Sequence, residues 1–287
     1  MKWLRLWHIG FAIFTLKIVL ITYLLITVLP KVEWSTAHID HTFLLFVIVG
    51  FVAQMIDGTL GMAYGVSCTT LLLHLGVLPR VASAAVHTAE VFTTGVSGLS
   101  HIRFKNIDKK LFFRLVFPGV LGSIVGAYFL SEVVDGNVIK PYVAIYLLVL
   151  GIIILIKGFR NKPKEHTEVK RAGLLALIGG FMDAVGGGGW GPIVTSNIIN
   201  QGKNPKETIG TVNTTEFFVA FFSTGVFLFF VGVESWPVVL GLITGGVVAA
   251  PVGAFFASRV NKRTLMILVG VIIILTSCYT VYRALWG

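Results

Sequence analysis

Residues 181–192 read Phe-Met-Asp-Ala-Val-Gly-Gly-Gly-Gly-Trp-Gly-Pro, a carboxylate followed by a run of glycines in the middle of an apolar segment. A related stretch lies 126 positions earlier, where residues 55–66 read Met-Ile-Asp-Gly-Thr-Leu-Gly-Met-Ala-Tyr-Gly-Val. In this register Asp57 matches Asp183, and Gly65 matches Gly191. An apolar helix interrupted by glycine is therefore predicted twice in the chain.

Composition places the chain among integral membrane proteins. Of its 287 residues, 55% are hydrophobic and 13% are charged, and the mean hydropathy is +0.88, which is too apolar for a soluble globular domain. Several runs reach the roughly 20 apolar residues needed to cross a hydrocarbon layer of ~30 Å. The net charge of +10 does not indicate nucleic-acid binding, because Lys and Arg lie in short loops and form no basic face. We expect the lipid bilayer as a partner, and no nucleic acid.

The sequence predicts neither a metal centre nor a cofactor site. Cys68 and Cys278 both lie in apolar runs without metal-ligand spacing. We expect both to be buried thiols, and a role of Cys68 in a site stays open. No Walker A sequence is present, so ATP binding of that kind is not expected.

The whole second half repeats the first, which fixes the expected fold. The identical pairs in the ungapped register are Thr69/Thr195, Gly76/Gly202, Pro79/Pro205, Val86/Val212, Thr88/Thr214, Glu90/Glu216, Phe92/Phe218 and Ser97/Ser223. We therefore expect an all-α membrane protein with four parts. These are an N-terminal transmembrane helix and outer loop (1–41), a first repeat (42–158), a basic cytoplasmic linker (159–171) and a second repeat (172–287).

Loop charge predicts that the two repeats are inverted. Positive residues mark cytoplasmic loops, so the basic stretches 101–114 and 157–171 are expected inside, and the acidic 131–139 loop outside. In the second copy the signs are exchanged, because the segment around Glu234 has no Lys or Arg and the later loop has Arg259, Lys262 and Arg263. We expect a multi-pass protein of the cytoplasmic membrane, with its N-terminus inside and its C-terminus outside.

The number of crossings stays open between two arrangements. The apolar piece from about 43 to 77 is too long for one helix at 1.5 Å per residue, yet each half of it is short for a full span. Either each copy has five short or tilted spans, or its first two pieces form a re-entrant hairpin followed by three spans. We favour the re-entrant hairpin.

The glycine-rich breaks are the predicted substrate site. Irregular backbone at membrane depth is tolerated only where it is buried in protein or lines a cavity. A new helix is expected to begin near Gly65 and near Gly191, and its first N–H groups would attract an anion. Two inverted copies bring two such helix starts together. The predicted substrate contacts here are Gly61, Tyr64, Gly65, Gly187, Gly188, Gly189, Trp190 and Gly191. We assign helix packing instead to the scattered glycines Gly119, Gly122, Gly126, Gly245 and Gly246.

Intramembrane acids form the second part of the predicted site. Asp57 and Asp183 lie at membrane depth, where a carboxylate is a functional hypothesis by default. They either take part in transport or accept hydrogen bonds from the N–H groups of the breaks. His87 and Glu90 are three residues apart, as are Asn213 and Glu216, so each pair shares a helix face. We expect these pairs either to bind a coupling proton and contact an oxyanion or to tie helices together.

These motifs support a family resemblance. Ile56-Asp57-Gly58-x-x-Gly61-Met62-Ala63-Tyr64-Gly65 and Asp183-Ala184-x-Gly186-Gly187-Gly188-Gly189-Trp190-Gly191-Pro192, each followed by a helix with a Glu, resemble the TauE/SafE sulfite exporter family over residues 43–284. The resemblance implies secondary export of sulfite or a sulfonate such as sulfoacetate. The first copy departs from the glycine run at Leu60, Met62 and Ala63, so the halves are expected to contribute unequally.

Other functions stay open beside this one. A passive anion channel would use the same helix starts without needing Glu90 and Glu216. An intramembrane aspartyl protease would pair two aspartates, but the glycine run follows Asp183 instead of leading into it, so we do not expect an enzyme. A structural subunit would transport nothing. A homodimer is also left open.

Overall fold

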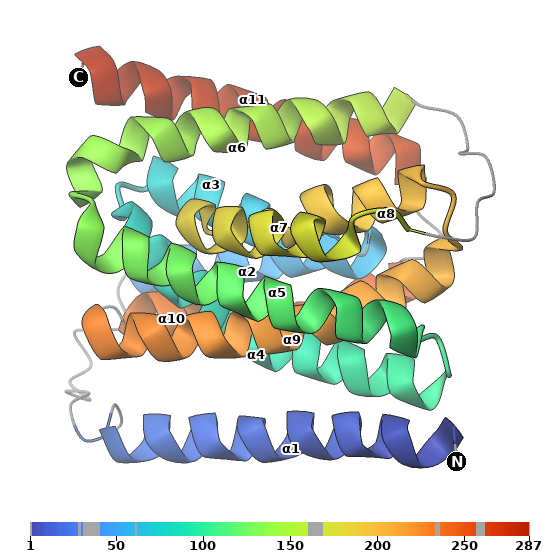
Figure 1. Ribbon diagram of the computed structural model, residues 1–287. Coiled ribbons are helices and arrows are strands. Elements are labelled where there is room, and N and C mark those ends of the chain that lie inside the picture. The colour runs from blue at the N-terminus through green and yellow to red at the C-terminus, as the bar shows by residue number, and fades with distance from the viewer. Residues whose placement is uncertain are drawn as a thin grey trace.

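The computed structural model shows an all-helical chain over the residues that it describes, which are 2–27, 30, 41–60, 62–159, 169–232, 236–256 and 262–286 (Figure 1). Its helices are α1 (Lys2–Thr27), α2 (His41–Leu60), α3 (Tyr64–His74), α4 (Pro79–Arg103), α5 (Lys109–Tyr128), η3 (Phe129–Val133), α6 (Gly136–Phe159), α7 (Ala172–Gly186), η4 (Gly191–Thr195), α8 (Ser196–Asn200), α9 (Pro205–Phe230), α10 (Trp236–Phe256) and α11 (Lys262–Trp286). The segments η3 and η4 are π-helices. Gly61, Glu234, Arg259 and most of the predicted linker 159–171 lie outside the described residues.

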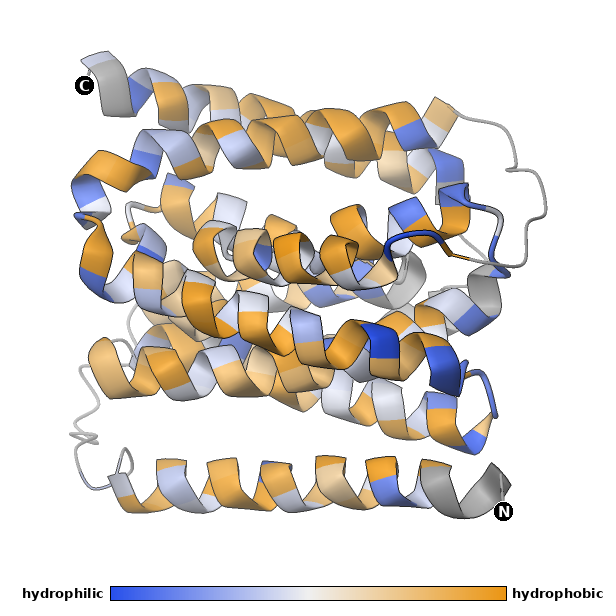
Figure 2. Cartoon of the chain, in the orientation of Figure 1, coloured by the Kyte–Doolittle hydropathy of each residue, from blue (hydrophilic) through white to orange (hydrophobic). Residues whose placement is uncertain are grey.

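Helix length and surface chemistry agree with the prediction of a membrane protein. Among the described residues, five helices are long and apolar enough to cross a bilayer: Leu6–Thr27, Lys109–Val133, Gly136–Phe159, Glu207–Phe230 and Arg263–Arg283. Large apolar side chains such as Phe117 and Phe229 are exposed on the outside of the bundle. Figure 2 shows hydrophobic residues along the length of the helices and hydrophilic ones gathered toward the ends.

The main helix pairs are related by exchange of the two halves of the chain. Helix α2 packs mainly against α10, α5 against α7, α4 against α9, and α6 against α11. The helices α2, α4, α5 and α6 of the first half correspond to α7, α9, α10 and α11 of the second. The α2–α10 pair therefore corresponds to the α7–α5 pair, while α4–α9 and α6–α11 each join two corresponding helices. Such a pattern is expected from the duplication, whose boundaries stay a prediction. Helix α1 stands outside this scheme and packs on α4 and α9.

Small residues allow the closest of these pairs to form. A Cβ at Gly126 of α5 would lie 2.6 Å from the Phe181 carbonyl oxygen of α7, and one at Gly50 of α2 would lie 2.7 Å from Leu242 Cα of α10. Gly122 and Gly245 likewise face the carbonyl groups of Leu177 and Val47. Close helix contact through small residues is the usual packing mode in membranes, and it is the role expected for Gly122, Gly126 and Gly245.

The helices flanking the second break form a hairpin that returns to the end from which it starts. Just before α7, the Lys170 N–H donates to Gln201 Oε1 just after α8, at 2.7 Å. Lys203 then pairs with Asp108 at the start of α5, at 2.6 Å. The segment η4–α8 has 10 residues, about 15 Å of helix, which is half of a ~30 Å hydrocarbon layer. These observations favour the re-entrant arrangement for this hairpin.

The first hairpin opens toward the opposite end of the bundle (Figure 1). Helix α3 has 11 residues and is followed by Leu78, whose side chain lies beside Gly136 at the start of α6. The second hairpin thus returns beside the start of α5, and the first returns beside the start of α6. Because α6 starts where the α5–η3 helix ends, the two hairpins return to opposite ends of the bundle. Helix α2 has 20 residues, and its apolar part His41–Asp57 is shorter than the five helices that are long enough to cross a bilayer, as is Ala172–Gly186.

The cysteine prediction holds for one residue only. Cys68 is fully buried in α3, whereas Cys278 is exposed on α11. An apolar run does not distinguish a core-facing from an outward-facing position in a membrane helix, because both faces are apolar.

Candidate substrate site at the two helix breaks

The site lies where two helices are interrupted by glycine-rich segments. Helix α2 ends at Leu60 and α3 begins at Tyr64, while α7 ends at Gly186 and η4 begins at Gly191. The new helices thus begin where the sequence predicts. Each preceding helix continues past its aspartate, so Asp57 and Asp183 lie in the last helical turns and not in the breaks themselves.

Both aspartates reach forward to the start of the next helix. Asp183 Oδ1 accepts a hydrogen bond from the Trp190 backbone N–H at 2.8 Å. The Asp57 carboxylate accepts one from the Tyr64 backbone N–H, seven residues on in both cases. A carboxylate at a helix start satisfies an N–H group that has no intrahelical acceptor. The hydrogen-bonding role left open by the sequence is therefore present in both copies.

The two breaks contact each other directly. A Cβ at Gly65 would lie 2.8 Å from Gly188 Cα and 2.9 Å from Glu90 Oε1, and one at Gly191 would lie 3.0 Å from Met62 Cβ. At the second break, φ is +65° at Gly187, +153° at Gly188 and +148° at Gly189. These angles favour glycine, and the close approach at Gly188 leaves no space for a side chain.

Side chains from other helices satisfy the carbonyl groups of the second break. The Thr69 hydroxyl donates to the Gly187 carbonyl, and the Tyr146 hydroxyl donates to the Gly188 carbonyl at 3.1 Å. Lys157 Nζ donates to the Pro192 carbonyl at 2.9 Å and also to Ser196 Oγ. The prediction of site residues missed Tyr146 and Lys157, for which the sequence carries no signal. The repeated pair Thr69/Thr195 was a signal for Thr69.

Helix α4 brings His87 and Glu90 to the end of α7. His87 Nε2 lies 3.2 Å from Asp183 Oδ2, and His87 Nδ1 lies 2.8 Å from the Ser83 carbonyl oxygen. The exposed fractions are 0% for His87, 1% for Asp183 and 2% for Glu90. The donor atoms of the three lie within 4.8 Å of one another. His87 and Asp183 face each other and both contact backbone groups, so we assign no metal here.

Four carboxyl groups share this region. Glu90 interacts electrostatically with Asp183, Glu216 and Asp57, and Glu216 interacts with both aspartates. Glu90 Oε2 is buried without a hydrogen-bond partner among the described residues. No Lys or Arg figures in the interactions of Glu90 or Glu216 within the described part of the chain. The structure thus brings the four predicted acids together.

Asn213 occupies the second-copy position that corresponds to His87, but it makes a different contact. Asn213 Nδ2 donates to Ser97 Oγ on α4 at 3.2 Å. Both Asn213 and Glu216 are partly exposed. The two copies are therefore chemically different at the site.

The rings of Tyr64 and Trp190 pack into two apolar clusters beside the breaks. Tyr64 packs with α2, α4 and α10, and Trp190 with α5, α7 and α9. The indole N–H donates to the Val212 carbonyl at 3.3 Å, which satisfies its one polar group. The Trp190 backbone N–H is the group that contacts Asp183.

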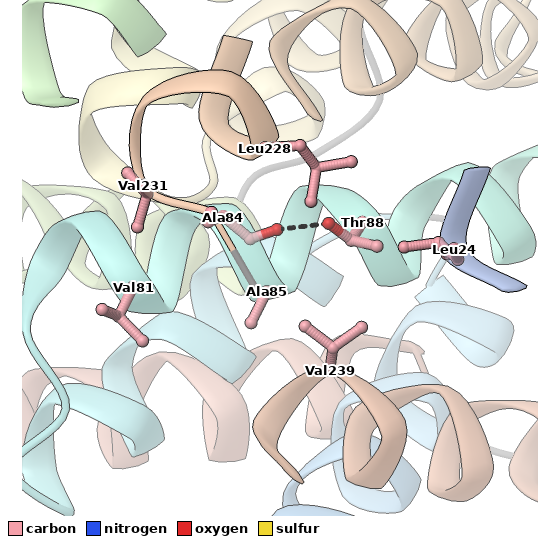
Figure 3. Close-up of a pocket in the computed structure, with 9 residues that line it drawn as sticks. Leu24, Val81, Ala84, Ala85, Thr88, Leu228, Val231 and Val239 are labelled. Carbon is pink, nitrogen blue, oxygen red and sulfur yellow. Dashed lines mark hydrogen bonds between the residues drawn. The ribbon is translucent and has the colours of Figure 1, made fainter. Parts of the chain in front are cut away.

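A separate cavity of about 20 Å³ lies between α1, α4, α9 and α10 (Figure 3). Its lining is apolar apart from Thr88, whose hydroxyl donates to the Ala84 carbonyl of its own helix at 2.7 Å. With no free donor and no positive charge, this cavity does not suit an anion.

Comparison with known proteins agrees with this architecture. A family model described as sulfite exporter TauE/SafE matches residues 46–280. The chain belongs to the TauE/SafE family. It is 45% identical over 246 residues to the probable membrane transporter protein YtnM of Bacillus subtilis (strain 168), covering 83% of this chain and 82% of that protein. No solved structure matches the chain.

A second relative covers a similar share of the chain. The probable membrane transporter protein YunE of Bacillus subtilis (strain 168) is 20% identical over 274 residues, which is 86% of this chain and 100% of that protein. This TauE/SafE member is therefore a multi-pass membrane transporter and not an enzyme.

Proposed function

We propose that the protein is a secondary transporter that exports a small sulfur-containing anion, sulfite or a sulfonate such as sulfoacetate, across the cytoplasmic membrane in a proton-coupled reaction. The observation that carries the proposal is the direct contact between the two breaks, at Gly65 and Gly188, beside four carboxyl groups. The anion class follows the description of the matching family.

Electrostatics supports the coupling to protons. The starts of α3 and η4 carry the positive ends of helix dipoles and attract anions, but Asp57 and Asp183 already accept from their N–H groups. Two unit charges 4 Å apart repel by about 4 kcal/mol at an effective dielectric constant near 20. An anion entering beside ionised Glu90 and Glu216 would be repelled by each of these charges. Protons are therefore expected to bind together with the anion.

The hairpins supply a route for alternating access. The tips contact each other at Gly65 and Gly188, which closes the centre in this conformation. Separation of the tips would expose the N–H groups to an anion, and the hairpins open toward opposite ends. Sites at the meeting point of broken helices are common in secondary transporters.

Glu90→Gln and Glu216→Gln test the coupling, because Gln keeps the shape of a protonated carboxyl group and cannot release a proton. In proteoliposomes with an imposed pH gradient, we expect gradient-driven sulfite accumulation to fall about 5–150-fold, the usual range for lost coupling between two ligands. Glu207→Gln, on the exposed start of α9, is the matched control. Wild-type accumulation in both variants would refute the role of Glu90 and Glu216 in coupling, and a wild type that equilibrates sulfite without responding to the pH gradient would favour a passive channel.

A further inference from the structure

A continuous polar chain joins α4 to the second break. The Trp190 N–H donates to Asp183 Oδ1, and Asp183 Oδ2 faces His87 Nε2 at 3.2 Å. On the other side of the ring, His87 Nδ1 lies 2.8 Å from the Ser83 carbonyl oxygen and 3.3 Å from Ser83 Oγ. Ser83 Oγ donates its own hydrogen to the Ala184 carbonyl at 2.6 Å. This series of polar contacts therefore begins at Trp190 and ends at Ala184, both in the segment that contains Asp183.

Counting hydrogens along this chain identifies one additional proton. A carbonyl oxygen only accepts, and the Ser83 hydroxyl hydrogen is used, so His87 Nδ1 must carry a hydrogen. The opposite nitrogen, Nε2, then faces a carboxylate oxygen. This contact is a hydrogen bond only if a second proton lies between the two atoms, on either the ring or the carboxyl group. Without it, two lone pairs would face each other in a site that is closed to water.

The second copy cannot hold this proton. In the register of the duplication, Asn213 stands where His87 does, and Ile209 stands where Ser83 does. The Asn213 amide donates to Ser97 Oγ and does not titrate, while Ile209 has no polar side-chain atom. The proton position is therefore a property of one half of the protein.

Several acidic side chains surround this proton, and its positive charge offsets their negative charge. Glu90 from α4, Asp57 from α2 and Glu216 from α9 lie within electrostatic range of the cluster. Tyr146 of α6 also lies within electrostatic range of Asp183, and Tyr64 and Cys68 of α3 lie within range of Glu90. The Phe227 ring of α9 covers the imidazole, with ring centroids 5.8 Å apart. No Lys or Arg figures among these groups in the described part of the chain.

We propose that the coupling proton binds between His87 and Asp183, in the first half only. This inference rests on the proposed function and names the site of its proton. Because the proton joins α4 to the end of α7, its departure removes the His87–Asp183 hydrogen bond, one of the hydrogen bonds that hold the second hairpin to the other helices. Proton release is thereby linked to separation of the two hairpin tips.

Two variants test the assignment. His87→Asn gives the first half the residue that the second half already has. Asp183→Asn keeps an oxygen acceptor for the Trp190 N–H and presents an amide N–H to His87 Nε2 in place of the proton. Thr88→Val, which alters a hydroxyl bonded only within α4, is the control. A short sulfonate whose charge is constant serves as substrate, so that its own titration does not enter.

In proteoliposomes, we expect His87→Asn to lower the ratio of gradient-driven sulfonate accumulation to exchange at equal pH by about 5–150-fold, whereas Thr88→Val keeps the wild-type ratio. In detergent, without substrate, we expect the wild-type melting temperature to vary with pH through the proton held between His87 and Asp183. The melting temperatures of His87→Asn and Asp183→Asn should depend less on pH than that of Thr88→Val. A wild-type profile in both variants would overturn the proposal.

The two readouts separate failure of the inference from failure of the proposed function. If the wild type moves neither sulfite nor sulfonate, the proposed function fails, and the melting profiles still decide whether the proton site exists. If the wild-type melting temperature responds to added Zn²⁺ or to a chelator in place of pH, the cluster binds a metal ion and the proton assignment is wrong.

Discussion

Gly188 shows most clearly what a single residue contributes to the site. Its φ of +153° is rarely adopted by residues with a side chain, and its α-carbon lies against the backbone of Gly65 and Val66 from the other break. The glycine run is therefore required by backbone geometry and by the approach of the two breaks. A structural and a functional reason for glycine coincide here, because the contact that needs glycine also forms the candidate site.

Gly188→Ala is predicted to destabilise the protein. Unfavourable backbone angles cost about 1–3 kcal/mol, and the added methyl group also forces the breaks apart. Gly225→Ala is the matched control, because a Cβ there meets no atom within 4 Å on the exposed face of α9, and alanine favours a helix by up to about 1 kcal/mol. Thermal unfolding in detergent compares the two. Equal melting temperatures for both variants would refute the close contact at the breaks.

The sequence predicts much of the site at the residue scale, but not how its parts meet. The duplication and the cost of buried charge single out Asp57, Glu90, Asp183 and Glu216. The His87–Asp183 contact joins residues 96 positions apart, and spacing along one helix reports only neighbours on that helix. The directions of the Tyr64 and Trp190 rings likewise depend on tertiary packing, so the sequence alone does not predict them.

At the scale of elements, Asp108 fixes the start of α5 and links it to the second half of the chain. Its side chain accepts from the Leu111 N–H at 3.1 Å and pairs with Lys203 at 2.6 Å. Partial burial by itself would raise the pKa of Asp108. The hydrogen bond from Lys203, the Leu111 N–H and the Lys203 charge outweigh it and lower the pKa below its ordinary value of 3.8.

A lowered carboxyl pKa stabilises the protein at pH values above the unfolded pKa, and this contribution is lost as the pH falls through the folded value. Asp108→Ala removes the cap and the charge and should cost about 1 kcal/mol at pH 7. Asp108→Asn keeps an N-cap and loses only the ion pair, so its effect should be smaller, about 0–1 kcal/mol. Melting temperatures at pH 7 and at about pH 3 measure both. If the difference in melting temperature between the wild type and Asp108→Asn were the same at about pH 3 as at pH 7, this explanation would be contradicted.

The sequence predicts helix starts better than helix continuations. Glycine and proline mark the breaks near Gly65 and Gly191, and the helices begin there. It does not show that α2 and α7 continue past their aspartates, nor that α5 ends in a π-helix at Phe129 and that the helix at Gly191 begins with one. Those features depend on partners such as Lys157, which donates to the Pro192 carbonyl from a distant helix.

At the scale of the whole molecule, basic segments gather at one end of the bundle. Arg114 donates to the Val169 carbonyl at 3.0 Å, which joins the two basic loops, and Leu6 and Trp7 of α1 share a groove with Arg103. The C-terminus lies at the opposite end (Figure 1). By the positive-inside rule, we propose that the basic end faces the cytoplasm.

This orientation predicts opposite accessibility of the two termini. An epitope tag at the C-terminus should be detected on intact cells, whereas a tag at the N-terminus should be detected only after permeabilisation. A tag inserted at Lys105, in the loop between α4 and α5, should behave like the N-terminal one. Detection of both terminal tags from the same side would refute the inverted arrangement of the repeats.

Counterflow of labelled sulfite into vesicles containing only this protein tests the central claim, that the two breaks together form an anion-transport site. Vesicles loaded with unlabelled sulfite should accumulate the label transiently, short sulfonates should compete, and Gly188→Ala should reduce the exchange. Absence of exchange with sulfite, sulfate and every sulfonate tried, in vesicles where the protein is folded, would contradict it.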